Sequence, residues 1–407
     1  MLREKLHHRL MPEQKNYRKT LTACCLGFVT QAIAANYAPL LFLTFMSSYG
    51  VGLEKVALIP ALFYITQLVV DFAATSFVDR VGYRVCVVVS QLISALGLVL
   101  LVALPELLPE PFVGVLIAVA LYAIGSGLVE VLVSPIVEAC PFENKAGMMS
   151  LLHSFYCWGA VAVILGSTLF FAAFGLEHWR LLTLIWAVLP LYNAFNFITC
   201  PIERLVEDGK SMRPRDLLRL PLFWLLILLM VCSGASEASM AQWASAFTES
   251  ALGVAKAVGD LAGPCLFAVC MGLARLLYVR LGQRVDLSCA LLVCGVLCVG
   301  CYLMAALAAA PLVGLIGCAL CGAAVGMMWP GALSISSQKC PTGGTAMFAF
   351  LALAGDLGAT ISPALVGNVA QVTGGDLKAG LLAATVFPLV LIFVLILLKM
   401  KRSGSPT

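Results

Sequence analysis

The chain has 407 residues, of which 61% are hydrophobic and only 11% are charged, and its mean hydropathy is +1.01. Soluble globular domains carry about 25% charged residues, so this composition excludes a soluble protein of this length. The net charge of +4 is small and arises from the loops, so it gives no indication of nucleic-acid binding.

Twelve apolar segments follow one another along the chain. Each is long enough for a helix to cross a hydrocarbon core about 30 Å thick. The first follows a basic stretch, but its apolar run of about 27 residues is too long for a signal peptide, so we expect an uncleaved helix. The sequence therefore predicts an all-α integral membrane protein with helices at approximately 20–46, 56–78, 85–104, 112–137, 147–173, 179–199, 221–247, 257–279, 287–309, 311–337, 344–371 and 377–398.

The basic residues indicate how these helices are oriented. If the N-terminus is cytoplasmic and the chain crosses the membrane at each segment, 20 of the 25 Lys and Arg residues lie on the cytoplasmic side. This asymmetry follows the positive-inside rule and predicts that both ends of the chain are cytoplasmic. We expect a multi-pass protein of the cell membrane, plasma or inner, whose loops are too short to form an extramembrane domain.

The 16 cysteines lie mostly in apolar runs. In a small secreted protein they would indicate disulfides, whereas thiols in membrane helices act as small hydrophobic side chains. The chain has no P-loop and no Ser–His–Asp spacing typical of a hydrolase. We therefore expect no metal, no cofactor, no ATP-driven step and no catalytic residue.

The longest hydrophilic connection, Cys200–Leu220, separates the sixth apolar segment from the seventh. A motif that follows the second helix, residues 78–85, recurs after the eighth helix as residues 278–285, with its arginines and glycine in the same places. Parallel halves of this kind are typical of transporters with a cavity at the membrane midplane. The predicted domains are an N-terminal bundle, a cytoplasmic linker and a C-terminal bundle, at 1–199, 200–220 and 221–407.

Residues 75–84 resemble the loop signature of the major facilitator superfamily, Gly-x-x-x-Asp-Arg-x-Gly-Arg-Arg. Thr75 replaces its first glycine and Tyr83 replaces one of its arginines. The resemblance implies twelve helices in two pseudo-symmetric six-helix bundles, with a conformational latch in this loop. The gating residues expected in the loop and its repeat are Asp79, Arg80, Arg84, Arg280 and Arg284.

Three patches resemble the fucose:proton symporter family and related bacterial sugar transporters. Gly125–Pro135 matches the pattern Gly-x-Gly-x-x-Glu-x-x-x-Asn-Pro, with Glu130 at the acidic position and a serine in place of the asparagine. His153–Ala160 and Met327–Gly331 resemble stretches of that family's fifth and tenth helices. The family's first helix carries an aspartate one turn before a proline, where this chain has Ala35 and Asn36 before Pro39. A coupling scheme based on that aspartate therefore does not transfer to this chain.

Several ionisable residues lie within the predicted helices, where each costs at least about 2.5 kcal/mol near the bilayer centre. Arg275 and Asp356 could form charge pairs or act in gating, and Arg275 could instead extend to the interface. Asp71 either has such a role or belongs to the loop latch. The five residues that need an explanation first are Glu130, His153, Glu237, Arg275 and Asp356.

Glu130 and His153 lie at similar depth on consecutive helices, each about 10 Å from the cytoplasmic end of its helix. A carboxylic acid and an imidazole at one level can share or exchange a proton. We expect Glu130 to be the proton-coupling acid and His153 to modulate it. A purely structural hydrogen bond between the two helices is the alternative.

Polar and aromatic side chains on several helices predict a substrate site. Uncharged hydrogen-bonding groups beside aromatic rings suit a sugar, whose hydroxyls need partners and whose C–H faces stack on rings. The seventh helix is unusually polar, and we expect Gly234 to break or bend it. Small residues there could instead indicate helix packing, and tryptophans could be interfacial anchors. The expected substrate-binding residues are Gln31, Asn36, Tyr37, Glu237, Gln242, Trp243, Trp329 and Asp356.

These features predict a secondary transporter that works by alternating access and carries a small polar solute, preferentially a monosaccharide, together with protons. Sodium is an alternative coupling ion, and a proton-driven exporter of drugs or amphipathic metabolites is the alternative function. A membrane-embedded enzyme would need a clustered catalytic set, and a transport-derived sensor a cytoplasmic extension. We expect a monomer in the bilayer whose partners are the substrate, the coupling ion and lipid, with no nucleic acid.

Overall fold

The computed structural model describes residues 16–51, 55, 58–206, 211–252, 261–281, 284–374 and 376–403. All regular elements in these ranges are helices, and 12 helical segments are long and apolar enough to cross a membrane. The predicted fold class and number of spans are therefore confirmed. The starts of the predicted second and eighth helices, 56–57 and 257–260, lie outside the described residues, as does Gly282 of the repeated motif.

The first six spans contain one break and several tight turns. Pro39 lies in the last turn of α2, which ends at Leu40, and its missing backbone donor leaves the carbonyl of Ala35 without its helical partner. α5 and α6 meet at Gly82, whose φ of 97° is accessible to glycine. The helices are α2 (Tyr17–Leu40), α3 (Phe42–Tyr49), α5 (Leu58–Val81), α6 (Tyr83–Leu107), α7 (Pro111–Ala139), α8 (Lys145–Phe174) and α9 (Trp179–Thr199), with a 3-10 turn η1 (Leu176–His178).

The last six spans begin after the short helix α10. The expected break of the seventh span at Gly234 is wrong, because α11 runs through this residue without interruption. Gly234 instead lies against the backbone of Gly355 in α17, which leaves no room for a side chain. The helices are α10 (Pro214–Leu218), α11 (Pro221–Leu252), the π-helix η2 (Leu261–Cys265), α13 (Leu266–Leu281), α14 (Leu287–Leu307), α15 (Pro311–Val325), α16 (Met328–Lys339), α17 (Gly344–Val372), α18 (Leu377–Ala384) and α19 (Val386–Ser403).

The helix starts show why the chain enters a helix where it does. The side chain of Asn144 accepts a hydrogen bond from the backbone N–H of Gly147 at 2.9 Å, and Asp286 accepts one from Cys289 at 3.0 Å. Both satisfy donors that have no partner within the helix. α7 and α15 begin at a proline, which suits the first turn because its missing donor would be unpaired there.

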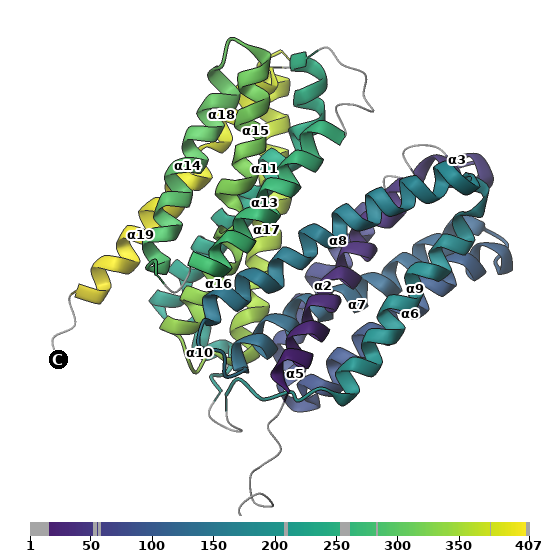
Figure 1. Ribbon diagram of the computed structural model, residues 1–407, viewed down its shortest axis with the longest axis horizontal. Helices are drawn as coiled ribbons and strands as arrows, with labels where there is room; N and C mark the ends of the chain where they lie inside the picture. The colour runs from purple at the N-terminus through teal and green to yellow at the C-terminus, as the bar shows by residue number, and fades with distance from the viewer. Residues whose placement is uncertain are drawn as a thin grey trace, which may run out of the picture.

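The two sets of six spans form two groups of helices that lie side by side (Figure 1). They approach one another near α10 and diverge toward the opposite end. Across the boundary α8 packs against α13, and α5 packs against α17. We call the region where the groups meet the closed end; Asp79 and Thr345 lie there, joined by a hydrogen bond of 2.7 Å.

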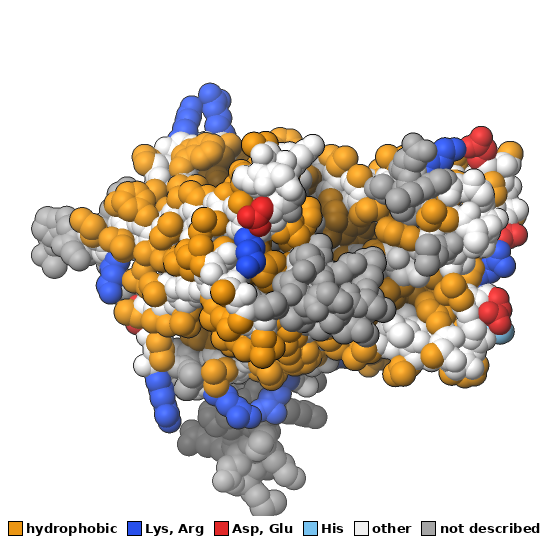
Figure 2. All heavy atoms as spheres, turned by 90° about the horizontal axis from the view of Figure 1, so that it is seen from above, with side chains coloured by type: hydrophobic (Ala, Val, Ile, Leu, Met, Phe, Trp, Pro, Cys, Tyr) orange, Lys and Arg blue, Asp and Glu red, His pale blue; other side chains and the backbone are white. Residues whose placement is uncertain are grey.

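The outer surface is apolar, as a bilayer requires. Side chains such as Phe72 on α5, Leu169 on α8 and Phe195 on α9 are each more than half exposed. Hydrophobic side chains cover most of the face seen in Figure 2, and few acidic ones interrupt them. Their exposure is explained if lipid tails, rather than water, surround them.

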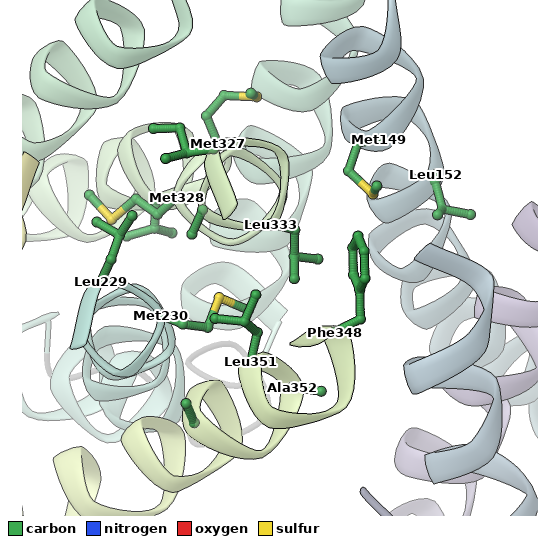
Figure 3. Packing of buried hydrophobic residues seen from close by; sticks show 14 of the residues in the cluster. Met149, Leu152, Leu229, Met230, Met327, Met328, Leu333, Phe348, Leu351 and Ala352 are labelled. Carbon is green, nitrogen blue, oxygen red and sulfur yellow. The ribbon is translucent and has the colours of Figure 1, made fainter. Parts of the chain in front are cut away.

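A continuous apolar core crosses the boundary between the two groups near the closed end. In Figure 3, Leu333 and Phe348 point from α16 and α17 toward Met149 and Leu152 of α8. Phe348 and both α8 residues are almost fully buried. The closed end is therefore held by apolar packing as well as by hydrogen bonds.

Most cysteines are buried and all are unbridged thiols, as expected. The sulfurs of Cys298 on α14 and Cys321 on α15 lie 4.0 Å apart. Among the described residues, no three His, Cys, Asp or Glu side chains are arranged to hold a metal ion. These thiols therefore act as small packing groups.

Candidate functional site

Glu130 on α7 is the acid around which the candidate site is built. The amide of Gln31 on α2 donates a hydrogen bond to Oε2 of Glu130 at 2.7 Å, and the amide of Gln67 on α5 donates to the same oxygen. Both donors are neutral, and no ion pair involving Glu130 occurs within the described chain. An acid held in this way can gain or lose a proton without breaking an ion pair.

His153 on α8 shares a small cavity with Glu130, but no hydrogen bond joins their side chains. Nε2 of His153 lies 3.2 Å from Oγ of Ser134, and the imidazole packs on Phe28 with 4.7 Å between ring centroids. In this conformation the cavity has room for about one water molecule, less than a sugar needs. It is lined by Glu130, Ser134, His153, Trp329, Leu333, Phe348 and Ala352.

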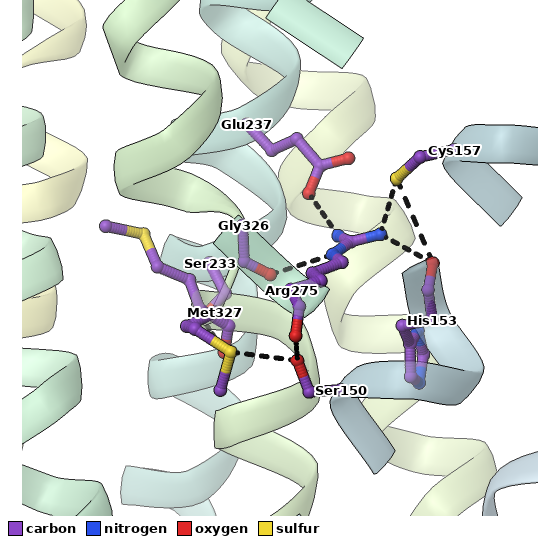
Figure 4. Close-up of polar contacts among 9 residues, drawn as sticks. Ser150, His153, Cys157, Ser233, Glu237, Arg275, Gly326 and Met327 are labelled. Carbon is purple, nitrogen blue, oxygen red and sulfur yellow. Dashed lines mark hydrogen bonds and ion pairs between the residues drawn. The ribbon is translucent and has the colours of Figure 1, made fainter. Parts of the chain in front are cut away.

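Arg275 on α13 is the hub of a second polar cluster (Figure 4). Its side chain is almost fully buried, so the alternative that it extends to the interface is wrong. Its guanidinium lies 3.4 Å from Oε2 of Glu237 on α11 and donates to the carbonyl of His153 at 2.8 Å. It also donates to the sulfur of Cys157 at 3.0 Å. Arg275 thus ties α13 to α8 across the boundary between the two groups of helices.

The break in the tenth span supplies Arg275 with a further acceptor. α15 ends at Val325 and α16 begins at Met328. Pro330 has no backbone N–H, so it cannot bond the carbonyl of Gly326 four residues earlier. Nε of Arg275 donates to that carbonyl at 2.8 Å. The proline therefore leaves an acceptor free, and the buried cation occupies it.

Asp71 on α5 and Asp356 on α17 face each other across the same boundary, with their carboxyl groups within hydrogen-bonding reach. Asp71 is fully buried, and neither of its oxygens has a conventional donor as partner. Oδ2 of Asp356 is also buried without one. The sequence left the role of Asp71 open, and the structure places it beside another acid, away from the loop latch.

The expected gating loop lies at the closed end, where its residues differ in their contacts. The hydroxyl of Thr345 on α17 donates to Oδ1 of Asp79 at 2.7 Å and also contacts the hydroxyl of Tyr83. Arg84 donates to the last carbonyls of α9, those of Phe197 and Ile198, at 2.8 and 2.7 Å. The other three expected gating residues, Arg80, Arg280 and Arg284, are exposed.

Other expected substrate residues lie apart from the Glu130 cavity. The hydroxyl of Tyr37 is buried between the carbonyl of Trp179 and the hydroxyl of Thr183. Asn36 donates to a carbonyl of its own helix at 2.9 Å. Gln242 is exposed, and the indole of Trp243 donates to the carbonyl of Pro363 at 3.1 Å.

Some residues of the site were not among those expected from the sequence. Gln67 contacts Glu130 directly, and it precedes Asp71 by four residues, which places both on one face of α5. The sequence signal for these two positions was the presence of two polar residues, four apart, in an otherwise apolar segment. Ser337 on α16, which donates to Glu138 on α7 at 2.9 Å, adds a further bond between the groups at the closed end.

The comparison with protein families settles the class of the protein. The family model of the Major Facilitator Superfamily matches residues 23–363. The chain belongs to the major facilitator superfamily. It is therefore a multi-pass membrane protein and a secondary transporter, and it is not an enzyme. No curated protein sequence matches the chain significantly.

Solved structures show the same fold at low sequence identity. The transporter FucP in its outward conformation is 18% identical over 95% of this chain and 99% of its own, with a TM-score of 0.78. A second FucP structure describes it as the Escherichia coli fucose:proton symporter. The proton:xylose symporter XylE is 12% identical over 92% of this chain and 94% of its own, with a TM-score of 0.78.

A transporter for another class of substrate is equally well covered. The human organic anion transporter MFSD10 is 16% identical over 94% of this chain and 100% of its own, with a TM-score of 0.72. At these identities the likeness shows the fold alone, and the substrate has to be argued from the side chains.

Proposed function

We propose that this protein carries a monosaccharide, or a polar solute of similar size, into the cell together with protons by alternating access. The observation that carries the proposal is the environment of Glu130, a cavity-facing acid whose partners among the described residues are the neutral amides of Gln31 and Gln67. It can exchange a proton with the cavity while its amide partners stay in place. The indole of Trp329 lines the same cavity and offers a flat apolar face to a sugar ring.

In this proposal Glu130 is the proton-coupling acid and His153 acts on it through the shared cavity. Gln31 and Trp329 then contact the solute, and Glu237 and Asp356 border its path. Tyr37 is excluded, because its hydroxyl is already engaged within the first group of helices. Opening of the closed end would enlarge the cavity, which now has room for about one water molecule.

The proposal includes an orientation and a domain division. The two bundles would comprise residues 1–199 and 221–407, joined by a linker at 200–220. The closed end, at which Arg80, Lys145 and Arg280 gather, would face the cytoplasm with both termini, as the positive-inside rule indicates. The protein would then lie in the cell membrane, closed toward the inside in this conformation.

The test is uptake of labelled monosaccharides into proteoliposomes, with and without an inward proton gradient. We expect one sugar to accumulate only with the gradient, and Glu130→Gln to abolish accumulation while Glu110→Gln does not. Glu110 is the matched control because it is exposed at the start of the same helix and its side chain forms no cap. Accumulation driven by a sodium gradient alone would show that the coupling ion is sodium and not the proton.

A negative result also has a defined meaning. If no sugar accumulates under either gradient, the proposal that the protein imports sugars is wrong. Export of drugs or amphipathic metabolites by proton antiport would then be the better proposal. Efflux of amphipathic dyes driven by a proton gradient of the opposite sign is the experiment that follows.

A further inference from the structure

The contact between Asp71 and Asp356 lies directly on the boundary between the two groups of helices. Asp71 comes from α5 and is fully buried, and Asp356 comes from α17. The two helices pack against each other along the boundary. Three of the four carboxyl oxygens are buried without any conventional donor. An arrangement of this kind needs a proton, because two adjacent carboxylates in a poorly solvated site repel each other strongly.

We propose that Asp71 and Asp356 share one proton and form a proton-binding site between the two bundles, separate from Glu130. With one proton, one carboxyl donates to the other, and the contact becomes a hydrogen bond that joins α5 to α17. Without it, two like charges face each other at the boundary. The role of the site in the transport cycle rests on the proposed function, whereas the presence of the proton does not.

Among the described residues, the ionisable groups that act on the two aspartates are acids. Glu130 on α7 faces the pair, and Tyr64 lies beside it on α5. Glu237 on α11 is paired with Arg275, the guanidinium lying 3.4 Å from its Oε2.

A bound metal ion would be the other way to hold two carboxyl groups together. Glu130 is a third acid nearby, but these acids do not converge on a point from which three of them could ligate a metal, within the part of the chain described. A proton needs only the two aspartates. The geometry therefore favours a proton over a metal ion at this contact.

The position of the pair connects its proton to the closed end. Asp71 precedes Asp79 by two turns of α5, which is about 12 Å along the helix axis. Asp79 bonds Thr345 on the same partner helix that carries Asp356. Loss of the proton would place a repulsive contact on the α5–α17 interface and loosen the closed end. Proton release would thus accompany opening of this end. The proton would then leave toward the side of the membrane to which this end opens.

Infrared spectroscopy of the reconstituted protein, with aspartate carboxyls labelled with ¹³C, tests the site directly. A protonated carboxylic acid has a C=O stretching band distinct from that of a carboxylate, and the label separates aspartates from Glu130. We expect one protonated-aspartate band at neutral pH, lost in Asp71→Asn and in Asp356→Asn. The band should persist in Asp376→Asn, because Asp376 is a helix cap at the surface and asparagine caps equally well.

Two results would overturn the proposal: the absence of a protonated-aspartate band in the wild type, or a band unchanged in both single variants. The double variant Asp71→Asn/Asp356→Asn keeps a neutral hydrogen-bonded pair and so protects the test against misfolding. Hydrogen exchange at the start of α17 should accelerate with rising pH more in the wild type than in this variant. Neither readout needs a substrate. Sugar uptake can therefore fail while the infrared band behaves as expected, and the band can be absent while sugar uptake succeeds.

Discussion

Glu130 and Glu237 are both partly buried glutamates in membrane-spanning helices, and their partners differ. Glu130 is bonded by the neutral amides of Gln31 and Gln67. Glu237 lies 3.4 Å from the guanidinium of Arg275, whose side chain is only 4% exposed. Protonation of Glu237 would leave a buried cation without its counterion, whereas protonation of Glu130 leaves no charge behind. The difference indicates that Glu130 is suited to carry a proton and Glu237 to hold a fixed charge.

The largest expected effect comes from removing the cation of the fixed pair. Arg275→Met should lower the free energy of unfolding by about 3–5 kcal/mol, because Glu237 and the carbonyl of Gly326 lose their buried partner. Thermal unfolding of the purified protein in detergent measures this loss. The double variant Arg275→Met/Glu237→Gln should recover part of it, since the unpaired carboxylate is gone.

The control for this prediction is Arg280→Met, one turn further along the chain and exposed, which should unfold like the wild type. If Arg275→Met also unfolded like the wild type, Glu237 would not depend on an ion pair. The distinction between the two glutamates would then have no energetic basis.

The two glutamates should respond differently to the same conservative substitution. In Glu130→Gln the remaining carbonyl oxygen can still accept both amides, so stability should change by less than about 1 kcal/mol. Exchange of solute across the membrane should persist while accumulation falls to passive equilibration. In Glu237→Gln the buried Arg275 loses its counterion, so the main effect should be a lower unfolding temperature. Uptake, counterflow and melting of both variants measure the contrast, and equal profiles would contradict it.

The closed end offers a smaller effect that reports on conformation. Thr345→Val removes the donor to Asp79, which costs about 1 kcal/mol and so raises the open population about fivefold. Burial raises the pKa of the Cys340 thiol, which lies beside this contact and is 5% exposed, so it reacts slowly when the end is closed.

Mass spectrometry after maleimide labelling should show faster modification of Cys340 in Thr345→Val than in the wild type. The rate should rise with pH in both proteins, because only the thiolate reacts and a raised pKa keeps the thiol protonated at neutral pH. The exposed Cys289 is the internal control and should react equally in both. An unchanged rate at Cys340 would show that the Thr345 bond does not hold this end closed.

The fold could be predicted from the sequence because a bilayer leaves few alternatives. A long apolar run has to become a helix that satisfies its own backbone, so the twelve spans follow from composition. The end of α2 at Leu40 was not predicted, because the apolar run that forms the first span continues to residue 46. Gly234 did not break α11, because a glycine in an apolar helix also serves close packing, here against Gly355.

The candidate site could be predicted only in part. Its ionisable residues stood out individually because each is costly in an apolar segment. Their partners did not, since the pairing of Glu237 with Arg275 and of Asp71 with Asp356 depends on how distant helices are rotated about their axes. Depth along two helices placed Glu130 and His153 at one cavity but could not show that Ser134, rather than Glu130, bonds the imidazole.

The smallest expected effect concerns an exposed ion pair, which can be compared with the pair of Arg275 and Glu237. Arg180 and Glu106 form a second Arg–Glu pair, but their side chains are 47% and 57% exposed. Arg180→Gln should therefore cost less than about 1 kcal/mol, and high salt should reduce even that. The melting temperature of Arg180→Gln and Arg275→Met, each at low and high salt, measures the difference. A large, salt-independent loss at Arg180 would mean that the ion pair itself sets the cost. A small loss there beside a large one at Arg275 would assign the cost to burial, which is the property that distinguishes Glu237 from a surface acid.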